Sequence, residues 1–310
     1  MSNLSVKIGK LSFKNPITVA SGTFAHAEKY YALEEVKRLG SIIPKTVTLY
    51  AQEGNPPPRI VETPSGMLNA IGIENPGVDV FIKEKLPKLK KIGVPLIVSI
   101  LGHGDDQFLK IIDQINPYVH TGSNTKDVCA LELNLSCPNL RHKTLVAQDA
   151  KAISRLIRKV KKRSKVPIFA KLTPNVTDIR PMVRAAEDAG ADGVSLINTL
   201  TAMVIDVEKR TSALGNFTGG LSGPAIRPVA VHMVHQAYKT VKIPIIASGG
   251  VMTAQDALQF IIAGASLVAV GTANFINPRA PLDVLDGIEV YMKRHKIKTI
   301  KELHGSLKQG

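Results

Sequence analysis

Three side chains with acid–base or nucleophilic potential lie in, or at the end of, apolar segments of the 310-residue sequence: Lys45, Lys171 and Cys137. An inward lysine is costly to bury without a partner, so each is expected to meet an anionic group, although a lysine near a strand end can also reach solvent. Schiff-base formation is a further option for either lysine. Cys137 precedes Pro138 and could act as a base or a nucleophile at the start of a loop. Cys129, at the other end of the same segment, is expected to be an inert buried thiol.

These side chains need a framework, and the sequence repeats a short apolar segment followed by a longer helical pattern. Eight segments are predicted as strands because they are short, rich in β-branched residues and almost continuously apolar, as in a parallel sheet covered on both faces. They are 17–22, 41–48, 95–100, 130–137, 167–172, 193–199, 244–250 and 267–272. Helical patterns between them include 149–163, 178–190, 224–238 and 253–265. Eight such units predict an α/β fold, a (β/α)8 TIM barrel that forms a single domain over residues 1–310. A doubly wound sheet is the alternative, but the early GxGxxG of its dinucleotide-binding form is missing.

In a TIM barrel the chemistry gathers where the strands end. The strand ends here carry polar, charged or small residues: Ser21, Lys45, Thr46, Ser99, Asn134, Cys137, Lys171, Asn198, Thr199, Gly249, Gly250, Gly271 and Thr272. Glycines after the last two strands allow close backbone approach, and these two loops commonly bind phosphate, so a phosphate site is predicted there. Two long insertions, 49–76 and 200–223, follow strand ends on the same face and are expected to be functional loops.

The composition argues against several other classes of protein. The chain has 40 Lys and Arg against 25 Asp and Glu, a net charge of +15, but the basic residues form local clusters expected on helix faces and in the tail. Without Trp and with 5% aromatic residues, little is available to stack bases, so nucleic-acid binding is not expected. Two cysteines cannot form a disulfide framework, a multi-cysteine metal site or a four-thiolate iron–sulfur cluster. Neither a signal peptide nor an apolar run of about 18 residues is present, so a cytoplasmic protein without a membrane span is expected.

A series of motifs covers almost the whole chain in order. They are ITVASGTF (17–24), PKTVT (44–48), NAIGIENPG (69–77), LELNLSCPN (131–139), AKLTPN (170–175), INTLTAMVID (197–206), GGLSGPAIRP (219–228), IIASGGV (245–251) and GTANF (271–275). Together they resemble the class 1 dihydroorotate dehydrogenases, and more closely the catalytic subunit of the NAD-linked, two-subunit (B) type.

The resemblance implies FMN as prosthetic group and oxidation of (S)-dihydroorotate to orotate in de novo pyrimidine (UMP) biosynthesis. It also implies a homodimer of this chain joined to an electron-transfer subunit, in which FAD and a [2Fe–2S] cluster pass electrons to NAD. Cys137 matches the catalytic base of the cysteine-using class. The positions that match FMN contacts are Ser21, Lys45, Thr46, Ser99, Asn134, Lys171, Ile197, Gly223, Gly249, Gly250, Gly271 and Thr272. The positions that match pyrimidine contacts are Lys45, Asn69, Ala70, Ile71, Gly72, Ile73, Asn134, Asn198 and Thr199.

Two features depart from the pattern of that family. Ser99 stands where the family usually has Asn, so the flavin contact expected there is lost or bridged by water. LRHKTLVAQD (140–149) replaces a glycine-containing run, which bears on how freely the loop that carries Cys137 moves.

Three other functions remain as alternatives at this point. One is a dihydropyrimidine dehydrogenase-like barrel, which shares the flavin and the cysteine but acts on uracil. The second is a Schiff-base aldolase that uses Lys171 or Lys45. The third is a basic nucleic-acid-binding protein, whose retention on DNA would depend steeply on salt. A flavin spectrum of the purified chain would exclude the last two.

Overall fold

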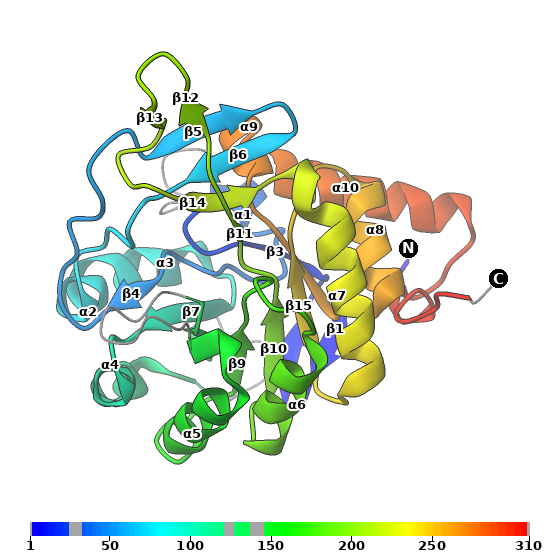
Figure 1. The fold of residues 1–310 in the computed structure, drawn as a ribbon. Coiled ribbons are helices and arrows are strands. Elements are labelled where there is room, and N and C mark those ends of the chain that lie inside the picture. Colours follow the sequence, from blue (N-terminus) through cyan, green and yellow to red (C-terminus); the bar gives the residue numbers. More distant parts are fainter. Residues whose placement is uncertain (1, 25–32, 121–126, 137–145, 309–310) are drawn as a thin grey trace.

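The computed structural model of the protein describes residues 2–24, 33–120, 127–136 and 146–308. It confirms the predicted barrel (Figure 1). Eight parallel strands pair in the order β3 (Ile17–Val19), β16 (Leu267–Val270), β15 (Ile245–Ser248), β10 (Gly193–Leu196), β9 (Ile168–Lys171), β8 (Val128–Asn134), β7 (Leu96–Leu101) and β4 (Val47–Thr48). The two edges of this sheet meet through the segment before β4. The N–H of Gly40 donates to the carbonyl of Ile17 at 2.9 Å, and the Thr18 hydroxyl donates to the carbonyl of Ser41 at 3.0 Å.

Helices surround the strands because each buries one apolar face against the sheet (Figure 1). The longer ones are α3 (Leu86–Ile92), α4 (Asp105–Ile115), α5 (Ala150–Lys161), α6 (Arg180–Asp188), α7 (Arg227–Thr240), α8 (Ala254–Ala263) and α10 (Ala280–Arg294). In α5, Ile153, Ile157 and Val160 are buried at helical spacing, and the Asp149 carboxylate caps the first turn by accepting from the N–H of Lys151 at 2.8 Å. The basic residues of α5 lie mostly on its exposed side, as predicted for the charge clusters.

The N-terminal end of the barrel is closed by a hairpin. Strands β1 (Val6–Ile8) and β2 (Leu11–Phe13) pair in an antiparallel manner, and Phe13 packs in one buried cluster with Ile97, Phe169 and Ile246 from the barrel strands. Gly193 leaves room for the Phe169 ring, since a Cβ at that position would come within 2.4 Å of it. The polar residues at the other ends of the strands are therefore the ones left to form a site.

The two insertions, expected as loops, contain strands that pair with each other. Strands β11 (Leu200–Ala202), β14 (Gly219–Ser222), β6 (Gly66–Asn69) and β5 (Ile60–Thr63) form an antiparallel sheet in that order, and β12 (Ile205–Asp206) and β13 (Thr211–Ser212) form a hairpin. Leu68, Ala70 and Leu214 make a small apolar core of their own beside this sheet. In Figure 1 this second sheet lies at the top of the molecule, across the end of the barrel opposite β1.

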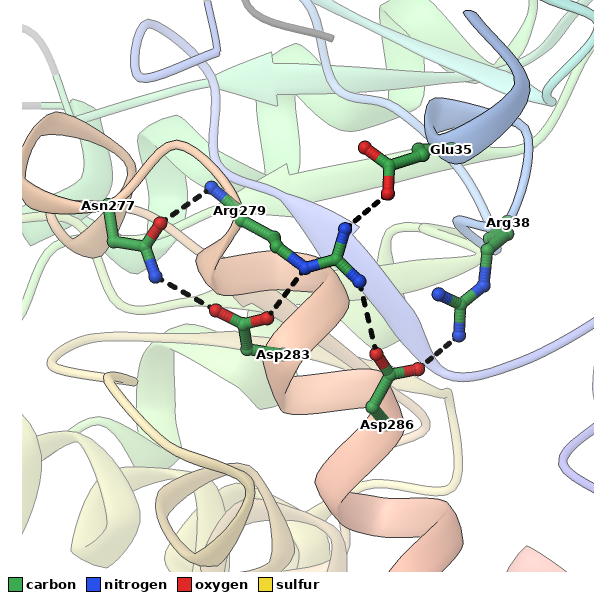
Figure 2. Close-up of polar contacts among 6 residues, drawn as sticks. All are labelled: Glu35, Arg38, Asn277, Arg279, Asp283 and Asp286. Carbon is green, nitrogen blue, oxygen red and sulfur yellow. Dashed lines mark hydrogen bonds and ion pairs between the residues drawn. The ribbon is translucent and has the colours of Figure 1, made fainter. Parts of the chain in front are cut away.

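A network of ion pairs fastens the short helix α1 (Leu33–Val36) to α10 (Figure 2). Arg279 contacts Glu35, Asp283 at 3.0 Å and Asp286 at 3.5 Å, and Asp286 also pairs with Arg38. Side-chain hydrogen bonds to these carboxylates raise the pKa of both arginines. Exposed ion pairs are individually weak, so the network matters mainly because it links two elements far apart in the sequence.

No helix among the described residues is long and apolar enough to cross a membrane.

The remaining helical segments are single turns: α2 (Val78–Val80), η1 (Phe81–Lys85), η2 (Asn116–Tyr118), η3 (Val146–Gln148), η4 (Pro224–Ile226), α9 (Ala273–Ile276) and η5 (Ile300–Glu302).

Candidate active site

A cavity of about 790 Å³ lies between the C-terminal ends of the barrel strands and the second sheet. This volume is within the usual range for sites that bind small molecules and cofactors. Most of the predicted site residues line it: Ser21, Lys45, Thr46, Asn69, Ile71, Gly72, Ile73, Asn134, Lys171, Ile197, Asn198, Thr199, Gly223, Gly249, Gly250, Gly271 and Thr272. Ser99 and Ala70 do not line it, and Cys137 lies outside the described residues.

The two predicted lysines both reach the cavity. Lys171 ends β9, is only 8% exposed, and pairs in register with Asn134 at the end of β8. Its Nζ lies 3.7 Å from an Oε1 of the buried Glu132. The Lys45 side chain runs past Gly22, where an added Cβ would lie 3.6 Å from the Lys45 Nζ. Both cations therefore face the cavity from the barrel wall, where an anionic ligand can approach them.

Three hydroxyl groups form a chain that leads down from the cavity wall. The Ser21 Oγ lies 2.9 Å from the Thr46 Oγ1, which in turn lies 3.0 Å from the Ser99 Oγ. Ser21 and Thr46 line the cavity, whereas Ser99 is fully buried beneath them. Ser99 therefore does not reach the cavity, and its hydroxyl is linked to the cavity wall through Thr46.

Side-chain amides gather on one side of the cavity. The Asn198 Nδ2 lies 3.5 Å from the Asn134 Oδ1, and the Asn198 Oδ1 accepts from the N–H of Thr199 at 2.9 Å. Asn69, on β6, donates to the carbonyl of Gly220 at 3.2 Å. Because an amide offers both donors and acceptors, this arrangement suits the edge of a planar heterocycle that carries C=O and N–H groups.

The loop after β6 is held in an unusual conformation. Ile73, which lines the cavity, has a φ of 57°, a region that a β-branched residue rarely adopts. Buried Asn75 stabilises the loop: its Nδ2 donates to the Thr48 Oγ1 at 2.7 Å and to the Ile73 carbonyl at 2.8 Å, while its Oδ1 accepts from the N–H groups of Thr48 and Gly77. Strain of this kind concentrates at functional sites. Asn75 is not among the predicted site residues, although the Asn75–Pro76 pair marks a turn in the sequence.

The glycines after β15 and β16, where the sequence predicts an anion site, line the cavity. Among the described residues, no acceptor bonds to the backbone N–H groups of Gly249, Gly250, Gly271 and Thr272. Gly250 has a φ of 74°, and a Cβ there would come within 2.6 Å of the carbonyl oxygen of Gly223. The site thus offers four N–H donors on a backbone that requires glycine at its tightest position, which suits a phosphate group.

The buried carboxylate of Asp256 holds the segment that follows Gly249 and Gly250. Asp256 accepts from the N–H groups of Met252 and Thr253 at 3.0 and 2.9 Å, and Arg227 pairs with it at 2.6 Å. Since Arg227 begins α7 and Thr253 caps α8, this acid joins the starts of two helices beside Gly250.

Several residues that line the cavity were not among the predicted site residues, although most of them lie in the quoted motifs or in the insertion 49–76. They are Gln52, Glu53, Met67, Glu74, Phe81, Lys85, Ser222, Ser248 and Phe275. Phe81 and Lys85 reach the cavity from η1, a π turn between two α-helical segments. Such turns are often found at functional sites, but nothing in an amphipathic pattern marks them.

The second cysteine has the inert environment predicted for it. Cys129 is 1% exposed at the start of β8, and its thiol donates to the carbonyl of Leu96 at 3.3 Å. Burial raises the pKa of this thiol to about 12. In the described part of the chain, no three His, Cys, Asp or Glu side chains are grouped to hold a metal ion.

The sequence matches known proteins over almost its full length. A family model described as dihydroorotate dehydrogenase matches residues 3–292. A protein of Lachnoclostridium phytofermentans named "dihydroorotate dehydrogenase B (NAD(+)), catalytic subunit" is 46% identical over 307 residues, which cover 99% of this chain and 100% of the relative. Proteins of the same name are 47% identical in Desulforudis audaxviator, over 97% of this chain and 96% of the relative, and 46% identical in Thermodesulfovibrio yellowstonii, over 100% of both. The chain belongs to the dihydroorotate dehydrogenase family.

Proposed function

We propose that this chain is the catalytic subunit of an NAD-linked dihydroorotate dehydrogenase, which oxidises (S)-dihydroorotate to orotate in pyrimidine (UMP) biosynthesis. The observation that carries the proposal is a combination of groups in one cavity: two lysines, facing asparagine amides, and four backbone N–H groups that have no acceptor among the described residues. This donor set matches an anionic pyrimidine dione next to a phosphate-bearing cofactor. The names of relatives that align with this chain over nearly their full length give the same activity.

FMN fits the residues that are present. The N–H groups of Gly249, Gly250, Gly271 and Thr272 can hold its phosphate, and Lys171 can meet the negative charge of the reduced ring. The cavity volume of about 790 Å³ leaves room for a small substrate beside the flavin. When bound, FMN supplies the acceptor for the hydride that leaves C6 of dihydroorotate.

The remaining steps belong to residues of this chain. Lys45 offsets the substrate carboxylate, and the amides of Asn134 and Asn198 hydrogen-bond the edge of the pyrimidine ring. The Cys137 thiolate takes the proton from C5, so that loss of a proton and a hydride completes the two-electron oxidation. Cys137 follows Ser136, whose hydroxyl donates to the carbonyl of Lys171 at 3.1 Å; this bond ties the chain just before the cysteine to the site.

We also infer that the chain works as a homodimer with an electron-transfer subunit that carries FAD and a [2Fe–2S] cluster and passes electrons to NAD. Two cysteines are too few for such a cluster in this chain, and the relatives are named as catalytic subunits. Copurification of a second subunit with flavin and iron would support this arrangement.

Anaerobic titration of the purified protein tests the activity. Dihydroorotate is expected to bleach the flavin absorbance. Dihydrouracil, the reduced form of uracil that the alternative uracil-type enzyme could oxidise, is expected to leave it unchanged. Bleaching by dihydrouracil alone would favour that alternative. A protein that carries FMN but is bleached by neither compound would contradict the proposal.

A further inference from the structure

Glu132 is a buried acid beneath the cavity that has no role in the proposed reaction. Glu132 lies on β8, is 1% exposed, and its Oε1 has no hydrogen-bond partner among the described residues. Its nearest ion-pair partner in that part of the chain is Lys171, whose Nζ lies 3.7 Å away. Burying a carboxylate that has one distant cation and no hydrogen bond to its Oε1 costs free energy. Its place beside the cavity therefore suggests a role in the site.

The strand register shows how Glu132 stands relative to the site. Glu132 and Asn134 point to the same inner face of β8, and Asn134 pairs in register with Lys171 on β9. Ser99 on β7 pairs in register with Glu132 itself. Glu132 therefore lies one layer below the residues that line the cavity. The distance of 3.7 Å is too long for a hydrogen bond, so the carboxylate attracts the Lys171 ammonium without taking up its donors.

We propose that Glu132 is a positioning residue that holds the Lys171 ammonium at the floor of the cavity and balances its charge. As far as the ligand is concerned, this inference rests on the proposed FMN function. An ammonium with a counter-ion at 3.7 Å stabilises negative charge on a reduced flavin less than an ammonium alone. Glu132 therefore limits how strongly the site favours reduced over oxidised flavin, so that the reduced form can still pass its electrons on.

The midpoint potential of the flavin-loaded protein tests this role. Glu132→Gln removes the negative charge at nearly constant shape, and we expect the ratio of affinities for reduced and oxidised flavin to rise about tenfold, a positive shift of about 30 mV for a two-electron couple. Glu132→Asp, which moves the carboxylate away from Lys171, is expected to give a smaller shift in the same direction. It also serves as the test variant if Glu132→Gln fails to fold.

Ser195→Ala is the matched control. Ser195 pairs in register with Lys171 from the opposite neighbour, β10, is 2% exposed, and has a hydroxyl without a partner among the described residues. Its removal perturbs the same layer without changing a charge, so an affinity ratio within twofold of the parent is expected. An equal shift in Ser195→Ala, or none in Glu132→Gln and Glu132→Asp, would overturn the proposal.

A double-mutant cycle on flavin-free protein separates this inference from the proposed function. Glu132→Gln and Lys171→Met each leave one buried charge without its partner. If the two groups interact, the unfolding constant of the double variant should be smaller than the value obtained by multiplying the two single effects. Multiplicative effects, within twofold, would show that the two groups do not interact. If the cycle shows coupling but the parent protein binds no flavin, the proposed function fails while the pairing stands.

Discussion

The Asn75 side chain donates a 2.7 Å hydrogen bond to the hydroxyl of Thr48, and this contact joins the loop after β6 to the end of a barrel strand. The same side chain accepts from the backbone N–H groups of Thr48 and Gly77 at 3.1 and 2.9 Å. One buried amide thus determines how the segment that contains strained Ile73 meets the cavity.

Asn75→Ala is expected to lower the free energy of unfolding by about 2–3 kcal/mol, because it leaves buried backbone donors without acceptors. The KM for dihydroorotate should rise more than kcat falls, since the variant loosens a binding loop and leaves the lysines in place. Urea unfolding and steady-state kinetics measure the two effects. Asn216→Ala, on an exposed turn, is the control and should change neither; an unchanged KM in Asn75→Ala would separate this loop from substrate binding.

The two cysteines give a built-in comparison. Cys137→Ala should retain FMN but slow flavin reduction by dihydroorotate about a hundredfold or more, as expected on loss of a general base. Cys129→Ala should reduce at the parental rate, because that thiol is buried and its pKa is raised to about 12. Stopped-flow absorbance under anaerobic conditions measures both.

A titration of thiolate absorbance adds a second readout for the cysteines. A thiolate that forms well below pH 12 in the folded protein belongs to Cys137 and should vanish in Cys137→Ala but persist in Cys129→Ala. Near-parental reduction in Cys137→Ala would remove this cysteine from the role of base.

Gly250→Ala tests the anion site. A side chain there would adopt an unfavourable φ of 74° and come within 2.6 Å of the Gly223 carbonyl oxygen, so FMN affinity should fall about tenfold to a hundredfold. Riboflavin, which has no phosphate, should bind both proteins with similar affinity. Gly104→Ala is the matched control, because its backbone is extended and an added Cβ meets nothing within 4 Å. Equal loss of affinity for FMN and riboflavin would argue that the glycine loop does not hold the phosphate.

Stability should depend on pH through His304. Burial lowers the pKa of this imidazole, which packs edge-on against Tyr238 with ring centroids 5.4 Å apart. A lowered pKa means that the unfolded chain binds the proton more readily. The contribution to stability is therefore present above the ordinary value of 6.5 and is lost as the pH falls through the lowered pKa.

Urea unfolding between pH 8 and pH 5 can detect this contribution. The parent should lose more stability over that range than His304→Gln, while His295→Gln, at an exposed position, should follow the parent. Parallel pH profiles for the parent and His304→Gln would contradict the assignment.

The sequence was sufficient for the barrel strands because each is a short, continuously buried apolar run. The strand predicted over 167–172 is β9 (Ile168–Lys171), and the strand predicted over 244–250 contains β15 (Ile245–Ser248). Within the predicted segment 41–48, only Val47–Thr48 forms a strand (β4), and Ile42 makes a single bridge. The start of the segment instead contacts β3, where the barrel closes. Strand ends in turn brought most of the predicted site residues to one cavity.

The second sheet could not be predicted in the same way. Its strands are three or four residues long and mostly half-buried, and β6 pairs with β14 about 150 positions later in the chain, so no local period reveals them. Ser99 and Ala70 illustrate the same limit at single positions. A motif gives their place in the chain, but only packing shows that Ser99 bonds to Thr46 below the cavity and that Ala70 joins the small core with Leu68.

The pairing of β6 with β14 also has a kinetic consequence. Asn69 and Gly220 are register partners, so the two insertions share one backbone ladder above the cavity. Neither can swing outward without carrying the other or breaking that ladder. The pairing therefore predicts that the two insertions open together, and substitutions that weaken the β6–β14 ladder from either side should alter the same opening rate.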